Sequence, residues 1–316
     1  MSERSEKTPK SIFKRLRTYT DEMFPILQYI PYIIALYVCL NFSSQILDGP
    51  SIIIDTYSIV GFVTAFFIML LMRTFDDLKD FELDFDLFPW RSIPQKLILK
   101  TDIQKLSFFC FSVIVAINLT LGQDTILVFG IVLLYCIGTF KWFFAEKTHR
   151  EKVFLTMATH QPIPYSINFY LIHTGLASGG VYNDFSMHHF FLLLIFSLPV
   201  TAWEVSRKIR SADKETHYET FSTIFGAKGA AVIAFIPLLI TSGLVTYLAT
   251  TLDVYFTFYI LAGVLTAGMS FFYLRFISKP TDKNNVLLKI TMAYTSLLFF
   301  GFLGHIIAIA DISFNF

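Results

Sequence analysis

The chain has 316 residues, of which 54% are hydrophobic and only 16% are charged, and its mean hydropathy is +0.59. An average soluble domain carries about 25% charged residues, so this composition excludes the soluble class and indicates a membrane protein. The net charge of +1 leaves no basic surface for nucleic acid once the positive residues are assigned to loops.

Apolar stretches long enough to cross a bilayer, roughly 20 residues each, recur along the whole chain. Lipid requires every backbone polar group to be satisfied within its own segment, so runs of this length are expected to be helices rather than barrel strands. We therefore predict an all-α membrane protein with nine transmembrane helices in a single domain over residues 24–316. The expected spans are about 24–47, 51–72, 104–121, 125–144, 153–174, 187–205, 225–249, 253–274 and 286–310.

The positive charges predict the orientation and support the count of nine. All 25 Lys and Arg residues fall in segments that would lie on one side of a nine-span topology: 4–17, 73–105, 141–152, 207–228 and 275–289. Because positive loops face the cytoplasm, we expect a cytoplasmic N-terminus and a C-terminus on the opposite side. Residues 1–23 form a polar, basic segment, and the first span, which lacks a small-residue cleavage site, is expected to be retained.

An acidic run follows the second span. Asp76, Asp77, Asp80 and Asp84 recur at spacings of three and four, so on one helix they would share a face. Like charges on neighbouring turns repel, and the adjoining hydrocarbon makes each charge costlier. A hard divalent cation would neutralise such a face, and carboxylate oxygens are its preferred ligands. The run therefore predicts a Mg²⁺ site.

Two further cytoplasmic segments carry candidate residues. Arg91 lies between two prolines after the acidic run, and Thr101 or Asp102 is expected to cap the third span. The segment after the sixth span combines acids with bases, which suits an anion bridged by a metal, although a solvated, charge-balanced loop explains it equally well. Its candidates are Glu204 and Asp213 for the metal and Arg207 and Lys208 for phosphate oxygens.

Weaker candidates lie within the spans. Lys141 ends the fourth span, where snorkelling to the interface is the default explanation. His160, Gln161 and Asn168 interrupt the fifth span near two prolines, which imply a bent helix; these side chains either line a cavity or bond neighbouring helices. The three cysteines all fall in expected spans and indicate neither a disulfide framework nor a metal motif.

The acidic run resembles the first aspartate-rich motif of the UbiA-type intramembrane prenyltransferases, N/D-D-x-x-D-x-x-x-D. Arg91-Ser-Ile-Pro94 is similar to the R-P-x-P segment that follows the motif in this family, and Lys141, after Tyr135, to a lysine that follows a tyrosine. The second family motif, D-x-x-x-D, is not reproduced. Glu204 and Asp213 stand in that region with bases between them, which puts a second Mg²⁺ in doubt.

The resemblance implies a helical bundle around a central cavity that opens near the cytoplasmic side. It implies a Mg²⁺-dependent enzyme that ionises an isoprenyl diphosphate and transfers the prenyl group to an aromatic or other lipophilic acceptor. The carboxylates of the acidic run would hold the metal and act in catalysis, and the diphosphate would be bound by Arg91, Lys141, Arg207 and Lys208. Intramolecular attack on the cation would instead make the protein a terpene cyclase of the same superfamily.

Two other classes fit the chain less well. A cation-coupled transporter would need charged groups at both ends of its pathway, whereas the ionisable residues gather at one end. A phosphatidyl-type transferase would carry a D-G-x-x-A-R motif, and this chain has Asp77-Leu-Lys-Asp80 instead.

Overall fold

The computed structural model describes residues 11–49, 51–180, 184–211, 214 and 220–315 and is almost entirely helical. The chain divides into two compact units. The first comprises Met1–Ile34 and Ile59–His149, and the second comprises Ala35–Ser58 and Arg150–Phe316. Two long helices, α2 (Ile26–Ile46) and α3 (Thr56–Lys79), each contribute residues to both units.

The first unit contains α1 (Ile12–Met23), α4 (Phe81–Leu87), α5 (Lys100–Asn118), α6 (Gln123–Phe140) and the short η1 (Trp142–Phe144), and α7 (Glu146–Glu151) begins at its end. Helix α5 begins at Lys100, and the N–H of the preceding Leu99 donates to the Asp102 carboxylate at 3.0 Å. Asp102 thus satisfies a free N–H at the helix start as expected, but from inside the first turn, because Leu99 holds the N-cap position.

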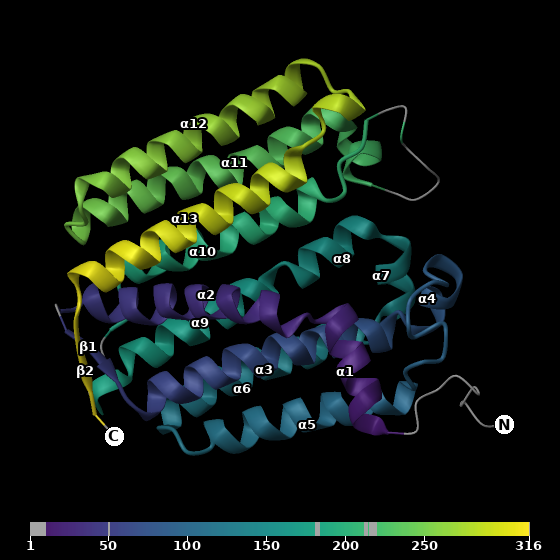
Figure 1. Cartoon of the computed structure of the whole chain (residues 1–316), viewed down its shortest axis with the longest axis horizontal. Helices are drawn as coiled ribbons and strands as arrows, with labels where there is room; N and C mark the ends of the chain where they lie inside the picture. The colour runs from purple at the N-terminus through teal and green to yellow at the C-terminus, as the bar shows by residue number, and fades with distance from the viewer. Residues whose placement is uncertain (1–10, 50, 181–183, 212–213, 215–219, 316) are drawn as a thin grey trace. The chain divides into compact units, whose positions relative to one another are not determined.

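The second unit contains α8 (Val153–His160), α9 (Pro162–Leu176), η2 (Ser178–Gly180), α10 (Met187–Ser206), α11 (Phe221–Thr251), α12 (Phe256–Ser278), η4 (Asp282–Asn284) and α13 (Leu287–Ile309). Helices α10 to α13 pack side by side (Figure 1). The connection from α11 to α12 is short, as is typical of antiparallel neighbours in helical bundles.

A two-stranded parallel sheet joins distant segments of the second unit. Strand β1 (Ser51–Ile54) pairs with β2 (Asp311–Phe314), with Ser51 opposite Asp311 and Ile54 opposite Phe314. Four residues expected to start the second span therefore form a strand instead, and α3 begins after them and runs to Lys79. This extension carries Asp76 and Asp77 on the same helix as the apolar stretch.

Eight helices among the described residues are long and apolar enough to cross a membrane, in agreement with a multi-pass integral membrane protein. The expected fifth span is instead divided between α8 and α9, each too short to be counted as a span. The break comes at Gln161, because Pro162 has no backbone N–H to continue the helix. The count of nine crossings, the orientation and the single domain remain predictions.

Candidate functional site

The acidic run, residues 76–84, extends from the end of α3 across the junction at Asp80 into α4. It is called the acidic turn below. Asp76 and Asp77 lie in the last turns of α3, Asp80 is the N-cap residue of α4, and Asp84 lies within α4. The Asp80 N–H donates to the Asp76 carbonyl at 3.0 Å, and the Asp84 N–H donates to the Asp80 carbonyl at 2.9 Å. The expectation of one continuous helical face is therefore wrong at Asp80, where the chain changes direction.

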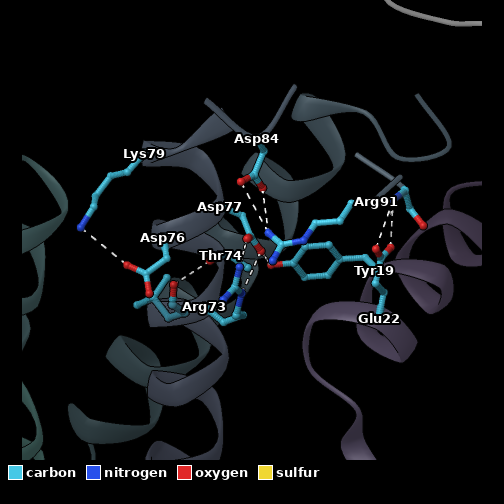
Figure 2. A network of polar contacts seen from close by, with 11 residues as sticks. Tyr19, Glu22, Arg73, Thr74, Asp76, Asp77, Lys79, Asp84 and Arg91 are labelled. Carbon is cyan, nitrogen blue, oxygen red and sulfur yellow. Dashed lines mark hydrogen bonds and ion pairs between the residues drawn. The ribbon is translucent and has the colours of Figure 1, made fainter. Parts of the chain in front are cut away.

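Asp76, Asp77 and Asp84 each form an ion pair, and Asp77 is the most buried of the three, with 1% of its side chain exposed. The Tyr19 hydroxyl donates to Asp77 Oδ2 at 2.6 Å, and Arg73 Nε donates to the same oxygen at 3.1 Å. A second guanidinium nitrogen of Arg73 donates to Oδ1. Figure 2 shows the tyrosine and the arginine directed at this one carboxylate, whose two oxygens both accept hydrogen bonds.

Asp76 faces a different base. Lys79 Nζ lies 3.6 Å from Asp76 Oδ1 and 4.4 Å from the centre of the Trp142 ring. Trp142 belongs to η1, in which three successive aromatic residues adopt a left-handed conformation with φ near +50°. Such residues cost roughly 1–2 kcal/mol each, so the contacts that hold this turn offset a substantial strain. The Trp142 ring is thereby placed over the lysine inside the acidic run.

Asp84 pairs with Arg91 from the following loop. Arg91 Nη1 lies 3.3 and 3.5 Å from the two carboxylate oxygens, and its guanidinium stacks over the Phe88 ring at 3.9 Å. Burial raises the pKa of the Asp84 carboxyl, and the positive charge of Arg91 opposes that rise. The structure thus places Arg91 against the acidic run within the first unit, and its role as a diphosphate ligand stays a prediction.

These side chains fit a divalent cation by donor type, because carboxylate oxygens are the ligands that Mg²⁺ prefers. Three carboxylates of the run each face a base: Arg73 for Asp77, Lys79 for Asp76 and Arg91 for Asp84. Within the part of the chain that the structure describes, no group of three His, Cys, Asp or Glu side chains is close enough together to hold an ion. Metal binding by this run stays a prediction.

The candidates of the second unit form contacts within their own segment. Glu204 accepts two hydrogen bonds from Arg207, from Nε at 2.8 Å and from Nη2 at 3.0 Å. Lys208 lies near the Phe221 ring, and burial together with the neighbouring Arg207 lowers the pKa of its ammonium group. Asp213 lies outside the described residues.

The polar residues of the fifth predicted span hold helices together. Gln161 accepts a hydrogen bond from the Thr201 hydroxyl of α10 at 2.9 Å, and Asn168 donates to Ser197 of α10 at 3.0 Å. His160 contacts the Thr156 carbonyl one turn earlier, at 2.8 Å. These contacts favour the helix-bonding interpretation for Gln161 and Asn168, and a cavity lined by them stays a prediction.

Lys141 is exposed at the end of α6, 5.1 Å from the Phe140 ring. It lies in the first unit with the acidic run, whereas Arg207 and Lys208 lie in the second. A diphosphate site shared by these three residues and Arg91 stays a prediction.

Sequence reasoning missed Tyr19, Arg73 and Lys79. Arg73 lies four residues before Asp77, which is a recognisable ion-pair spacing on a helix, and Lys79 stands inside the run itself. Tyr19 is separated from Asp77 by 58 residues and carries no local signal.

The comparisons with known proteins support the fold. No protein-family model matches the chain, and no curated protein matches it. The structure is similar to that of a digeranylgeranylglyceryl phosphate synthase in membranes, with a TM-score of 0.65, 16% sequence identity, and coverage of 93% of this chain and 99% of that one. This likeness confirms the prenyltransferase-like helical fold that the resemblance of the acidic motif implies.

Proposed function

We propose that the protein is a Mg²⁺-dependent intramembrane prenyltransferase that ionises an isoprenyl diphosphate at the cytoplasmic side and transfers the prenyl group to a lipophilic acceptor. The observation that carries this proposal is the acidic turn between α3 and α4, on a chain with the fold of a membrane-bound synthase of an isoprenoid lipid. Fold alone does not specify chemistry, and the clustered carboxylates and bases at this turn supply the chemical argument.

Asp76, Asp77, Asp80 and Asp84 would hold the metal, with Glu204 and Asp213 as candidates for a second ion. When bound, Mg²⁺ supplies positive charge to the diphosphate oxygens as the allylic C–O bond breaks. Arg91, Lys141, Arg207 and Lys208 would donate hydrogen bonds to those oxygens. Donors fixed where negative charge develops stabilise the departing diphosphate without having to reorganise.

The remaining steps need an apolar environment and a proton acceptor. The C–O bond breaks with its electron pair leaving on diphosphate, the allylic carbon then bonds to the nucleophilic atom of the acceptor, and the proton that the acceptor loses passes to the released diphosphate. The apolar helices would hold the isoprenoid chain and keep water from the cation. The aromatic rings of the bundle suit a cationic intermediate, since ring faces attract positive charge.

The test compares two aspartates a turn and a half apart. Asp80→Ala should abolish Mg²⁺-dependent diphosphate release by purified protein in detergent or liposomes. Asp86→Ala, an exposed position on α4, should retain it. A wild-type rate for Asp80→Ala, or no diphosphate release by the wild-type protein from prenyl diphosphates of any length, would overturn the proposal.

The same assay separates transfer from cyclisation. Release that requires an added acceptor, such as an aromatic or glycerol-based nucleophile, indicates transfer. Hydrocarbon products formed without an acceptor would assign the chain to the cyclases instead. Cation-driven uptake into liposomes without diphosphate release would indicate a transporter.

A further inference from the structure

Helix α1 lies within the polar N-terminal segment and contacts the acidic turn through Tyr19. Its twelve residues bury two polar side chains one turn apart, Arg15 and Tyr19, on the face that packs against the rest of the first unit. Phe13 and Arg17, on its other side, are exposed. Buried polar side chains need hydrogen-bond partners. In α1, Arg15 bonds to Asp102 and Tyr19 bonds to Asp77.

The central contact of α1 is made by Tyr19. Its side chain is fully buried among Ile93, Ile98 and Ile103, while its hydroxyl donates to Asp77 at 2.6 Å. A tyrosine hydroxyl carries its proton at neutral pH, so in this contact it is the donor. A phenylalanine would fill the same apolar site, so what the hydroxyl adds is its polar contact, the bond to Asp77.

Two further contacts fix α1 on either side of Tyr19. Near the start of α1, Arg15 forms a buried, two-bond ion pair with Asp102 of α5, at 2.6 and 2.8 Å. Near its end, the Glu22 carboxylate accepts the backbone N–H of Ser92 at 3.1 and 3.2 Å (Figure 2). Ser92 follows Arg91, so this contact reaches the loop that carries the base paired with Asp84.

We propose that α1 positions the acidic turn and that Tyr19 is a positioning residue, which orients the Asp77 carboxylate for metal binding. This inference rests on the proposed function. Tyr19 and Arg73 together give both Asp77 oxygens a hydrogen-bond donor, so the carboxylate is held in one orientation. Outer partners of this kind orient metal ligands, and their loss typically costs about 10–100-fold in metal affinity.

The test measures metal binding directly as well as activity. Tyr19→Phe should raise the Mg²⁺ concentration that half-saturates diphosphate release by about tenfold, with kcat at saturating Mg²⁺ largely retained. The Mg²⁺ concentration at which the ion raises the thermal midpoint of the protein should shift by the same factor. Tyr29→Phe is the matched control, because Tyr29 is a partly exposed tyrosine of α2 whose ring stacks on Phe24, and it should leave both values unchanged.

A second variant acts at an exposed position and so carries little risk of misfolding. Glu22→Ala should also raise the half-saturating Mg²⁺ concentration, but by a smaller factor. It removes the contact to the loop at Ser92 and leaves the hydrogen bonds of the Asp77 carboxylate in place. Asp21→Ala, at the exposed neighbouring position, should leave that concentration unchanged. Asp21 faces Arg17 at 3.7 Å on the surface.

The outcomes separate this inference from the proposed function. Wild-type protein without Mg²⁺-dependent diphosphate release and without Mg²⁺-induced thermal stabilisation would overturn both. Mg²⁺-dependent wild-type activity with unchanged Mg²⁺ dependence in Tyr19→Phe and Glu22→Ala would overturn the positioning role alone. A lower thermal midpoint in Tyr19→Phe with an unchanged half-saturating Mg²⁺ concentration would show that the hydroxyl only supports the fold, and would also overturn it.

Discussion

The ion pair between Arg15 and Asp102 should behave as a coupled unit whose loss is most costly when only one partner is removed. Both side chains are buried, with 9% and 1% exposed, and two guanidinium nitrogens contact the carboxylate. Removing one partner of a buried pair leaves an uncompensated charge and typically costs about 3–5 kcal/mol. We expect Arg15→Met, which keeps an unbranched apolar stem, to destabilise the protein by this amount.

The double substitution should cost less than either single one. With Arg15→Met and Asp102→Leu together, neither charge remains buried, and the main loss is the Asp102 hydrogen bond from the Leu99 N–H. Losing a capping acceptor costs about 1 kcal/mol. The coupling energy between the two positions is therefore expected to be several kcal/mol, far above the value for independent sites, roughly 0.3–0.5 kcal/mol.

Three buried, free cysteines provide the assay. Cys39, Cys110 and Cys136 become accessible to a thiol-reactive fluorescent dye only when the protein opens, and Cys110 lies on α5 with Asp102. For chains of 150–250 residues, 1 kcal/mol shifts the thermal midpoint by roughly 2–4 °C, so Arg15→Met should lower it by about 10 °C. The surface pair is the control. Arg17 and Asp21 are 84% and 71% exposed, and Arg17→Met should cost under about 0.5 kcal/mol.

The reasoning fails if the double variant melts at the midpoint expected from adding the two single effects, because the side chains would then be energetically independent. It also fails if Arg15→Met and Arg17→Met shift the midpoint equally. Burial would in that case contribute nothing to the difference between two arginines of one helix.

Two further predictions concern the candidate diphosphate ligands. Arg91→Ala should raise the KM for prenyl diphosphate about tenfold or more, since a charge-assisted hydrogen bond is worth about 1.5–3 kcal/mol. Arg91→Lys should recover part of the lost affinity. Equal KM values for wild type and Arg91→Ala would contradict this role. Because burial lowers the pKa of Lys208, its positive charge is lost at a lower pH than that of an ordinary lysine. Diphosphate binding should therefore weaken, and the KM rise, as alkaline pH passes the lowered pKa. Lys208→Arg, which stays charged, should show no such rise in KM. Identical KM profiles across pH for the two proteins would exclude the role.

Hydrophobic length predicted most of the spans because lipid leaves the backbone few alternatives. It failed where local chemistry overrides length. Residues 153–176 are apolar enough overall, but Pro162 begins a second helix, and the stretch divides into α8 and α9. Similarly, the regular spacing of the aspartates predicted one helical face, whereas Asp80 leaves the helical conformation and starts α4. The Asp80 side chain makes no capping hydrogen bond to α4, so aspartate's preference for the N-cap position does not account for this break.

The partners of the acidic run divide by sequence separation. Arg73 and Lys79 are within four residues of the carboxylates that they face, and helical geometry alone predicts these contacts. Arg91 follows Asp84 by seven residues; the resemblance assigned it to diphosphate oxygens, and its pairing with Asp84 was not predicted. Tyr19 could not be predicted, because a contact across 58 residues depends on how α1 packs against the other helices of the first unit.

The pairing of carboxylates with bases changes the electrostatic argument for a metal site. Sequence spacing suggested that the aspartates repel one another and need an ion. In the structure Asp76, Asp77 and Asp84 each face a base, so repulsion among them is already offset. Residues 73–91 nevertheless hold six acids and only three bases, and the surplus lies at the end of an apolar helix, where anionic charge is costly. The case for an ion therefore rests on this surplus of acids, which includes Asp80, the half-buried residue whose backbone joins α3 to α4. Asp80→Ala tests it at the point where the two helices meet.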